Sequence, residues 1–128
     1  MNTGRIPDWT AQGFLPPNDP SDPTSFQRSP YVVTIADFIR RFGTTPNRQA
    51  ILRGLLAFRE ALHAAGLNHG FQWVDGSFLE DVETNHRRDP EDVDVVTFFK
   101  LPETQSQESF AMWMPILFVS MTIRPRSL

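Results

Sequence analysis

Two aspartates separated by a single residue, Asp92 and Asp94, form the pattern in this 128-residue sequence that is best suited to chemistry. They begin an apolar, β-prone run, and side chains two residues apart in a strand point to the same face. Burying an ionised carboxylate without a partner is costly, so the pair needs an explanation. One interpretation is structural, with both carboxylates at a strand end facing solvent or an arginine. The other is a divalent cation, because Mg²⁺ is commonly held by one or two carboxylates together with phosphate oxygens and water.

A glycine and a serine, Gly76 and Ser77, follow another short β-prone segment and favour the cation interpretation. A glycine after a strand lets a ligand approach the backbone closely, and free N–H groups in such a turn can hold phosphate oxygens. The Ser77 hydroxyl adds a donor, and Asp75 is placed to cap the turn rather than to bind metal. The order of strand, bend, loop and acidic strand therefore predicts a phosphate cradle beside a metal-binding pair. That arrangement suits withdrawal of charge from a triphosphate and alignment of a nucleophile at its α-phosphorus.

Composition excludes several other functions. The chain has no cysteine, which rules out disulfide scaffolds, Cys-ligated zinc or iron–sulfur sites and thiol nucleophiles. Its three histidines have no zinc spacing, and the cluster of His86, Arg87 and Arg88 is either a solvated loop or a contact to a triphosphate or acceptor. A formal charge of −3 argues against a protein that coats nucleic acid. A run of about 18 apolar residues and a signal-peptide core are both lacking, so we expect no membrane association and a cytoplasmic location.

The N-terminal residues 1–33 carry six of the eleven prolines and predict an extended arm. Proline prevents regular helix and is excluded from central strands. Four apolar residues could pin the arm onto a folded body: Ile6, Trp9, Phe14 and Leu15. Residues 34–128 then form the folded domain.

Capping signals predict two helices in that domain. A short helix near residues 35–42 has Thr34 as its N-cap and Gly43 in the left-handed position after its last turn. A longer helix starts at Pro46, behind the N-cap Thr45. Its apolar stripe is expected in the core and consists of Ile51, Leu52, Leu55, Leu56, Phe58 and Leu62. Its charged residues are expected mostly on other faces: Arg48, Arg53, Arg59 and Glu60.

Two strands are expected at residues 71–75 and 93–99, where aromatic and β-branched residues gather. A polar run from Glu80 to Glu91 separates them, and Glu80, Asp81 and Glu83 are expected to be acidic residues of that loop. A polar linker at residues 101–109 then leads to an apolar C-terminal segment. The pattern of helices and strands favours an α/β (α+β) fold.

The sequence Val74-Asp75-Gly76-Ser77-Phe78, followed after a spacer by Asp92-Val93-Asp94-Val95, resembles the hallmark of nucleotidyltransferase-fold proteins. That hallmark is a hydrophobic residue, Gly, Gly or Ser, a spacer and then Asp-hydrophobic-Asp-hydrophobic. The spacer here has fourteen residues (92 − 77 − 1), which is slightly long. Further segments resemble an uncharacterised microbial branch of the superfamily: Ile6-Pro7-Asp8-Trp9, Gly13-Phe14-Leu15-Pro16-Pro17 and Phe38-Ile39-Arg40-Arg41-Phe42-Gly43.

This resemblance implies a small mixed sheet flanked by helices. It implies that Asp92 and Asp94 are catalytic ligands of Mg²⁺ or Mn²⁺, and that Gly76 and Ser77 contact phosphate. The implied activity is transfer of a nucleoside monophosphate from a nucleoside triphosphate to a hydroxyl or similar acceptor, which could belong to a protein, an RNA or a small molecule. Transfer would be an in-line displacement without a covalent enzyme intermediate.

The superfamily also supplies a third carboxylate from a later strand, and here the sequence departs from it. After Lys100 the acidic residues are Glu103 and Glu108, both in the polar linker. Met112-Trp113-Met114-Pro115 can be encoded only as ATG-TGG-ATG-CCN, and the frame that starts one base earlier encodes Val-Asp-Ala. We therefore expect a C-terminal segment truncated or altered by a frameshift, which would leave the domain incomplete and impair catalysis. An ordinary apolar edge strand is the alternative.

Two other functions are consistent with these residues. A non-catalytic binding or regulatory module would keep the fold without the third carboxylate and act through a partner protein, for instance as one half of a toxin–antitoxin or defence pair. A small α/β protein with a structural aspartate pair would bind neither Mg²⁺ nor nucleotide.

Overall fold

The fold of the chain was described with a computed structural model, which covers residues 5–21, 28–100 and 116–126. Its elements, in chain order, are α1 (Ile35–Phe42), α2 (Pro46–Ala64), β1 (Gly70–Asp75), the 3₁₀ turn η1 (Ser77–Leu79), α3 (Val82–Asn85), β2 (Val93–Lys100) and β3 (Ile116–Ile123). The three strands form one sheet in the order β1-β2-β3. The predicted α+β class is confirmed. None of the helices in the described ranges has the length and apolar character needed to cross a membrane.

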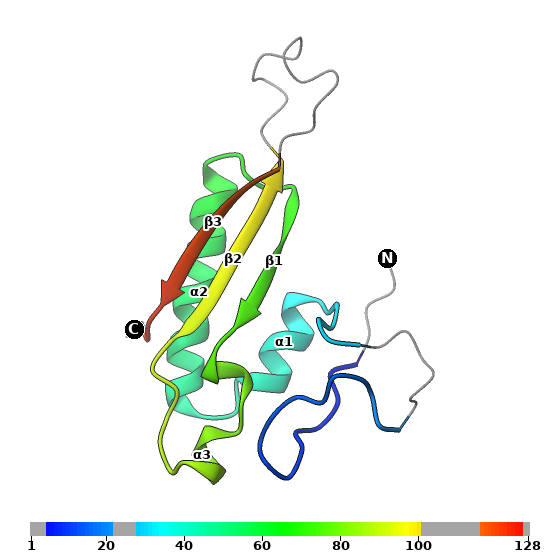
Figure 1. Cartoon of the computed structure of the whole chain (residues 1–128). Helices are drawn as coiled ribbons and strands as arrows, with labels where there is room; N and C mark the ends of the chain where they lie inside the picture. The colour runs from blue at the N-terminus through cyan, green and yellow to red at the C-terminus, as the bar shows by residue number, and fades with distance from the viewer. Residues whose placement is uncertain (1–4, 22–27, 101–115, 127–128) are drawn as a thin grey trace.

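Both ladders of the sheet are antiparallel, whereas the resemblance implies a mixed sheet. The reason lies in the connection between β1 and β2. That connection, through η1 and α3, stays at the end where β1 finishes, so β2 must run back in the opposite direction (Figure 1). In the resulting register Trp73 pairs with Val96 and Asp75 with Asp94.

The predicted helix starts are confirmed by their caps. The Thr34 hydroxyl accepts a hydrogen bond from the Asp37 N–H at the start of α1, and the Thr45 hydroxyl accepts one from the Arg48 N–H at the start of α2. The prediction of a left-handed Gly43 is wrong, because its φ is −86°. A glycine is needed there for close approach instead, since a Cβ would lie 2.7 Å from the carbonyl oxygen of Ile39.

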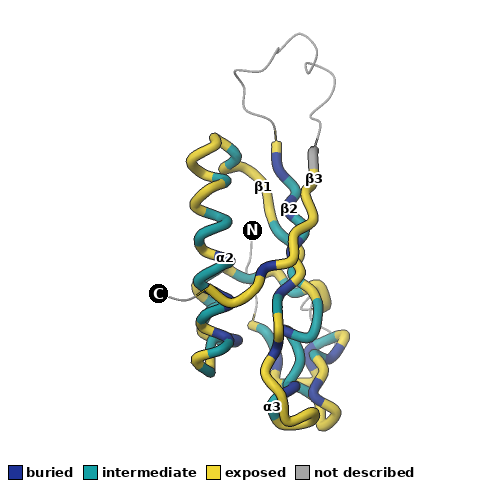
Figure 2. The backbone as a smooth tube through the Cα atoms, turned by 90° about the vertical axis from the view of Figure 1, so that its left-hand side faces the viewer, coloured by how far each residue is buried: buried dark blue, intermediate teal, exposed yellow. Residues whose placement is uncertain are grey.

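The core lies between α2 and one face of the sheet. The predicted stripe residues Ile51, Leu52 and Leu55 are buried, whereas Leu56 remains 43% exposed. The buried residues of β2 alternate along the strand and point toward this layer: Val93, Val95, Thr97 and Phe99. Figure 2 shows α2 running along one side of the sheet.

The arm contains no helix or strand in its described residues, apart from an isolated bridge between Asn18 and Arg28. Trp9 anchors it, because the indole N–H donates a 2.7 Å hydrogen bond to the carbonyl oxygen of Leu79 in η1. Three of the four predicted anchors pack against the core, namely Ile6, Trp9 and Leu15. Phe14 is 51% exposed and does not. The arm therefore touches the segment that follows the Gly-Ser bend.

Candidate functional site

The bend after β1 depends on glycine. Gly76 has φ +98° and ψ −176°, a combination that is essentially restricted to glycine. The Gly76 N–H donates a 2.8 Å hydrogen bond to the Asp75 carboxylate, so Asp75 caps the turn as predicted. The chain then enters η1, in which the Leu79 N–H reaches the Gly76 carbonyl at 3.1 Å and the Glu80 N–H reaches the Ser77 carbonyl at 3.0 Å. The backbone of the bend is therefore fixed on both sides.

The acidic strand lies directly against this bend. A Cβ placed on Gly76 would lie 3.1 Å from Oδ2 of Asp94, a contact tighter than nine in ten real Cβ contacts. Glycine is thus required here by its backbone angles, and the neighbouring carboxylate leaves little room for a side chain. The sequence prediction that the Gly-Ser bend and the acidic strand lie side by side agrees with this contact, as far as Gly76 and Asp94 are concerned.

Asp94 is exposed and has no arginine among its described partners. Its Oδ1 accepts a 3.0 Å hydrogen bond from the hydroxyl of Thr122 in β3. Across the sheet on the other side it pairs with Asp75, which is also acidic. This row of the sheet therefore has a local excess of negative charge. Like charges directly opposite each other destabilise a sheet.

Asp92 comes just before β2 and is half-buried, in contrast to the exposed Asp94. Since Val93 and Val95 point into the core, Asp92 and Asp94 have the alternate positions expected for carboxylates on one side of the chain. Nowhere in the described ranges do three or more His, Asp or Glu side chains gather in a way that could hold a metal ion. Asp92 and Asp94 alone would leave most positions around a hard cation to water or phosphate oxygens.

Thr122 occupies the position in β3 directly opposite Asp94, where it contributes a hydroxyl instead of a carboxylate. Glu103, Glu108 and the Met112–Pro115 segment lie outside the described residues. Ile116–Ile123 forms an edge strand that pairs with β2 over its full length, in agreement with the alternative to a frameshift. The described part of β3 thus supplies no third acid next to Asp94.

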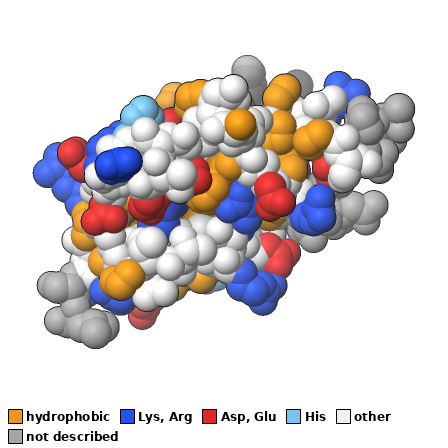
Figure 3. Space-filling view, turned by 90° about the horizontal axis from the view of Figure 1, so that it is seen from below, with side chains coloured by type: hydrophobic (Ala, Val, Ile, Leu, Met, Phe, Trp, Pro, Cys, Tyr) orange, Lys and Arg blue, Asp and Glu red, His pale blue; other side chains and the backbone are white. Residues whose placement is uncertain are grey.

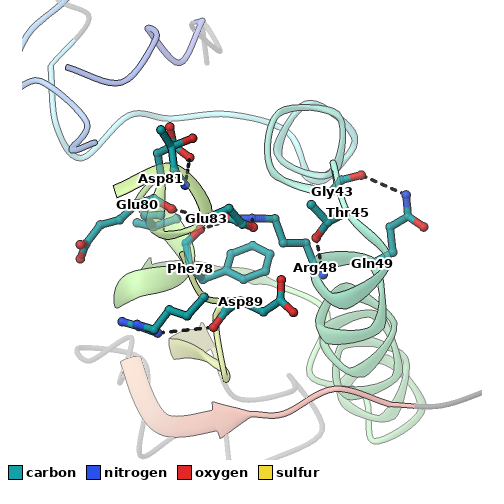
Figure 4. A network of polar contacts seen from close by, with 12 residues as sticks. Gly43, Thr45, Arg48, Gln49, Phe78, Glu80, Asp81, Glu83 and Asp89 are labelled. Carbon is teal, nitrogen blue, oxygen red and sulfur yellow. Dashed lines mark hydrogen bonds and ion pairs between the residues drawn. The ribbon is translucent and has the colours of Figure 1, made fainter. Parts of the chain in front are cut away.

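An ion pair beneath the bend was not predicted from the sequence. Arg48 is fully buried, and the prediction that it faces away from the apolar stripe is wrong. Its guanidinium donates to both carboxylate oxygens of Glu83, with Nε–Oε2 2.5 Å and Nη2–Oε1 3.0 Å, and to the carbonyl oxygens of Phe78 and Glu80, both at 2.6 Å (Figure 4). Its spacing from Ile51, Leu52 and Leu55 was the available signal, because positions i, i+3, i+4 and i+7 share one helix face.

This network fastens η1 and α3 to the first turn of α2. Burial is the largest single influence on the pKa of Glu83 and raises it, but hydrogen bonds from Arg48 and from the Glu83 backbone, with the charge of Arg48, leave that pKa below its ordinary value. Glu83 is therefore ionised and paired near neutral pH, and does not belong to a solvated acidic loop as predicted. Because η1 begins at Ser77, the same network holds the bend in place.

The other charged residues of the connecting segment have local roles or face solvent. Asp81 is the N-cap of α3, where its carboxylate accepts a 3.4 Å hydrogen bond from the Thr84 N–H. His86, Arg87 and Arg88 are exposed, in agreement with a solvated loop. Seen from the end of the molecule at which α3 lies, acidic and basic side chains are interspersed (Figure 3). The acidic row of Asp75 and Asp94 is therefore distinguished by its contact with the bend rather than by the charge of the whole surface.

These features define a small α+β domain in which an open antiparallel sheet carries an acidic residue against a glycine bend. The chain belongs to the Family of unknown function (DUF6932), which it matches over residues 7–124. Comparison with curated proteins gives no match, and comparison with solved structures gives none either.

Proposed function

We propose that this domain binds a nucleoside triphosphate at the end of the sheet formed by Gly76, Ser77 and Asp94, and transfers its nucleoside monophosphate to an acceptor hydroxyl. The observation that supports this most directly is the position of the Asp94 carboxylate, 3.1 Å from where a Cβ of Gly76 would lie. A phosphate that rests on the bend would thereby be next to an acidic group, and the two can be joined favourably only through a cation. The proposal therefore requires Mg²⁺ or Mn²⁺.

Each residue has a defined role in this proposal. Asp92 and Asp94 would hold the cation, which supplies neutralisation of phosphate charge when bound. The backbone at Gly76 and Ser77, together with the Ser77 hydroxyl, would orient the phosphates. The acceptor oxygen would then form a bond to the α-phosphorus while the bond to pyrophosphate breaks, with pyrophosphate as leaving group. A cytoplasmic location would provide the nucleotide.

A second candidate, a non-catalytic binding or regulatory module, is favoured by Thr122. A hydroxyl opposite Asp94 leaves the described site with fewer carboxylates than the nucleotidyltransferase resemblance implies. Such a module would bind nucleotide without transfer and act on a partner protein, as in a toxin–antitoxin or defence pair. The frameshift hypothesis, which would also impair transfer in the first candidate, is tested by sequencing the gene and its neighbours: an immediate stop codon in the alternative frame, with no further family-like strand, would contradict it.

Calorimetric titration with Mg²⁺ and ATP tests binding. We expect Asp94→Asn to abolish Mg²⁺-dependent binding of ATP, and Ser77→Ala to weaken it. Asp89→Asn is the matched control, because Asp89 is an exposed acid in the same connecting segment and the same charge is removed. If the wild-type chain binds neither Mg²⁺ nor ATP, the aspartate pair is structural and the proposal fails.

Incubation with labelled ATP and candidate RNA, protein or small hydroxyl compounds separates the two candidates. Transfer of label that is lost in Asp94→Asn and kept in Asp89→Asn supports catalysis. Binding of ATP that Asp94→Asn abolishes, without transfer to any of these acceptors, supports the regulatory module.

A further inference from the structure

The face of the sheet opposite α2 carries a group of exposed aromatic side chains. Phe71, Trp73 and Phe118 are 52%, 54% and 68% exposed. They surround Phe98, which lies 4.9 Å from Phe71 in a stacked arrangement, 5.1 Å from Trp73 edge-on and 6.0 Å from Phe118, measured between ring centroids. We call these four residues the aromatic platform. Large contiguous exposed apolar patches are a feature of interaction sites.

The aromatic platform is continuous with the proposed phosphate site. Trp73 and Asp75 are alternate residues of β1 and are both exposed, and their partners in β2 are Val96 and Asp94. Alternate residues of a strand share a face and are about 6.6 Å apart. The Trp73 indole therefore lies one step along the same face from the acidic row, on the side away from the bend. In a nucleotide the ribose provides a separation of similar size between the base and the α-phosphate.

The charges on this face select among ligands. The described residues of the platform and of the row between it and Asp94 are aromatic, aliphatic or hydroxyl-bearing: Phe71, Trp73, Val96, Phe98, Phe118 and Ser120. Lys100, the next residue of β2 on this face, is exposed and supplies one cation beyond Phe98, whereas a strand of nucleic acid that followed these rows would need a cation for each of its phosphates. A neutral, flat ring needs none. The surface therefore fits a ligand with one heteroaromatic ring on the aromatic platform and its charged groups at the Asp94 end.

We propose that Trp73, supported by Phe98 and Phe71, stacks on the base of the same nucleoside triphosphate whose phosphates lie at Gly76 and Asp94. This base subsite rests on the proposed function and extends it to the part of the ligand that carries no charge. Stacking on an aromatic face tolerates every base, but a purine covers more of the indole than a pyrimidine does. The subsite therefore favours ATP or GTP over CTP or UTP.

Calorimetric titrations of the full chain with Mg²⁺-ATP and with Mg²⁺-tripolyphosphate, which has no base, test this inference. We expect Trp73→Leu to weaken binding of ATP about tenfold and to leave binding of tripolyphosphate unchanged. Trp73→Phe retains a ring and should keep most of the affinity for ATP. Phe14→Leu is the matched control, because Phe14 is an equally exposed aromatic residue on the arm, and it should change neither titration. Denaturant unfolding of each variant verifies that the domain is intact.

The outcomes separate this inference from the function on which it rests. If ATP binds and Asp94→Asn abolishes binding, but Trp73→Leu leaves the affinity for ATP unchanged, the base subsite is wrong and the proposed function stands. Equal loss of ATP and tripolyphosphate binding in Trp73→Leu also overturns the subsite, because the effect is then structural. If Trp73→Leu abolishes a dimer of the chain without changing nucleotide affinity, the platform is a protein interface instead. If the wild-type chain binds neither ligand, both proposals fail.

Discussion

Glu83 in α3 and Asp94 in β2 are both acidic, and the protein treats the two carboxylates differently. Glu83 faces a buried guanidinium and forms two hydrogen bonds with it. Asp94 is exposed, accepts one hydrogen bond from the Thr122 hydroxyl and pairs across the sheet with another acid, Asp75. The first carboxylate has its charge balanced within the protein. The second has no cation among the partners that the described residues provide.

This difference indicates which of the two is available for a ligand. If a cation took the carboxylate that is paired with a buried arginine, the buried guanidinium would lose its partner, which is costly. A carboxylate whose described partners are a hydroxyl and a like charge gains from a cation. Arg48 and Glu83 therefore build the support for the bend, and Asp94 is the carboxylate to which the proposed function assigns a cation.

The largest effect should come from removing the arginine of the support. We expect Arg48→Met to destabilise the domain by about 3–5 kcal/mol, because it leaves the Glu83 carboxylate and the Phe78 and Glu80 carbonyls without their donor. Urea unfolding followed by circular dichroism measures the free energy of unfolding. Arg53→Met is the control: Arg53 also lies on α2, and its hydrogen bond within the described part of the chain is an exposed one to the Arg126 carbonyl, so its loss should cost about 1 kcal/mol or less. Equal losses in the two variants would contradict a special role for Arg48.

A smaller effect, with a defined pH dependence, should come from the acid of the support. We expect Glu83→Gln to cost about 1.5–3 kcal/mol at pH 7, where hydrogen bonds to charged groups are lost. Because the pKa of Glu83 lies below its ordinary value, its contribution is complete above the ordinary glutamate pKa of about 4.3 and disappears as the pH falls through the lower folded value. The difference in unfolding free energy between wild type and Glu83→Gln should therefore shrink below about pH 4. A difference that is constant down to pH 2 would show that Glu83 does not act through its charge.

Local patterns were sufficient to predict much of the fold. The hydroxyls of Thr34 and Thr45 mark helix starts because a cap involves only residues within one turn. The alternation of β2 is likewise a local property, and it predicts which residues of that strand are buried. Gly76 was recognisable because a glycine after a β-prone run favours a bend.

The support for the bend depends on contacts between distant residues, and for that reason it was missed. Arg48 and Glu83 are 35 residues apart in the chain, and an arginine on the apolar face of a helix is ordinarily expected to be exposed. Its burial becomes favourable only when η1 and α3 place two carbonyls and a carboxylate around it. The register that sets Asp75, Asp94 and Thr122 in one row is also long-range, so the sequence predicted the acidic residues and the bend beside them but not the pairing of Asp94 with Asp75 and Thr122.

The smallest expected effect has the opposite sign and tests the other half of the comparison. We expect Asp94→Asn to stabilise the domain by about 0.2–1 kcal/mol at low salt, because it removes a like charge opposite Asp75 while the side-chain oxygen can still accept the Thr122 hydrogen bond. The gain should decrease as salt screens the repulsion, and Asp89→Asn should show no comparable gain. Added Mg²⁺ should stabilise the wild type more than Asp94→Asn in the same urea titrations. A loss of stability in Asp94→Asn would mean that Asp94, like Glu83, is needed for the fold, and the distinction between a supporting and a binding carboxylate would no longer hold.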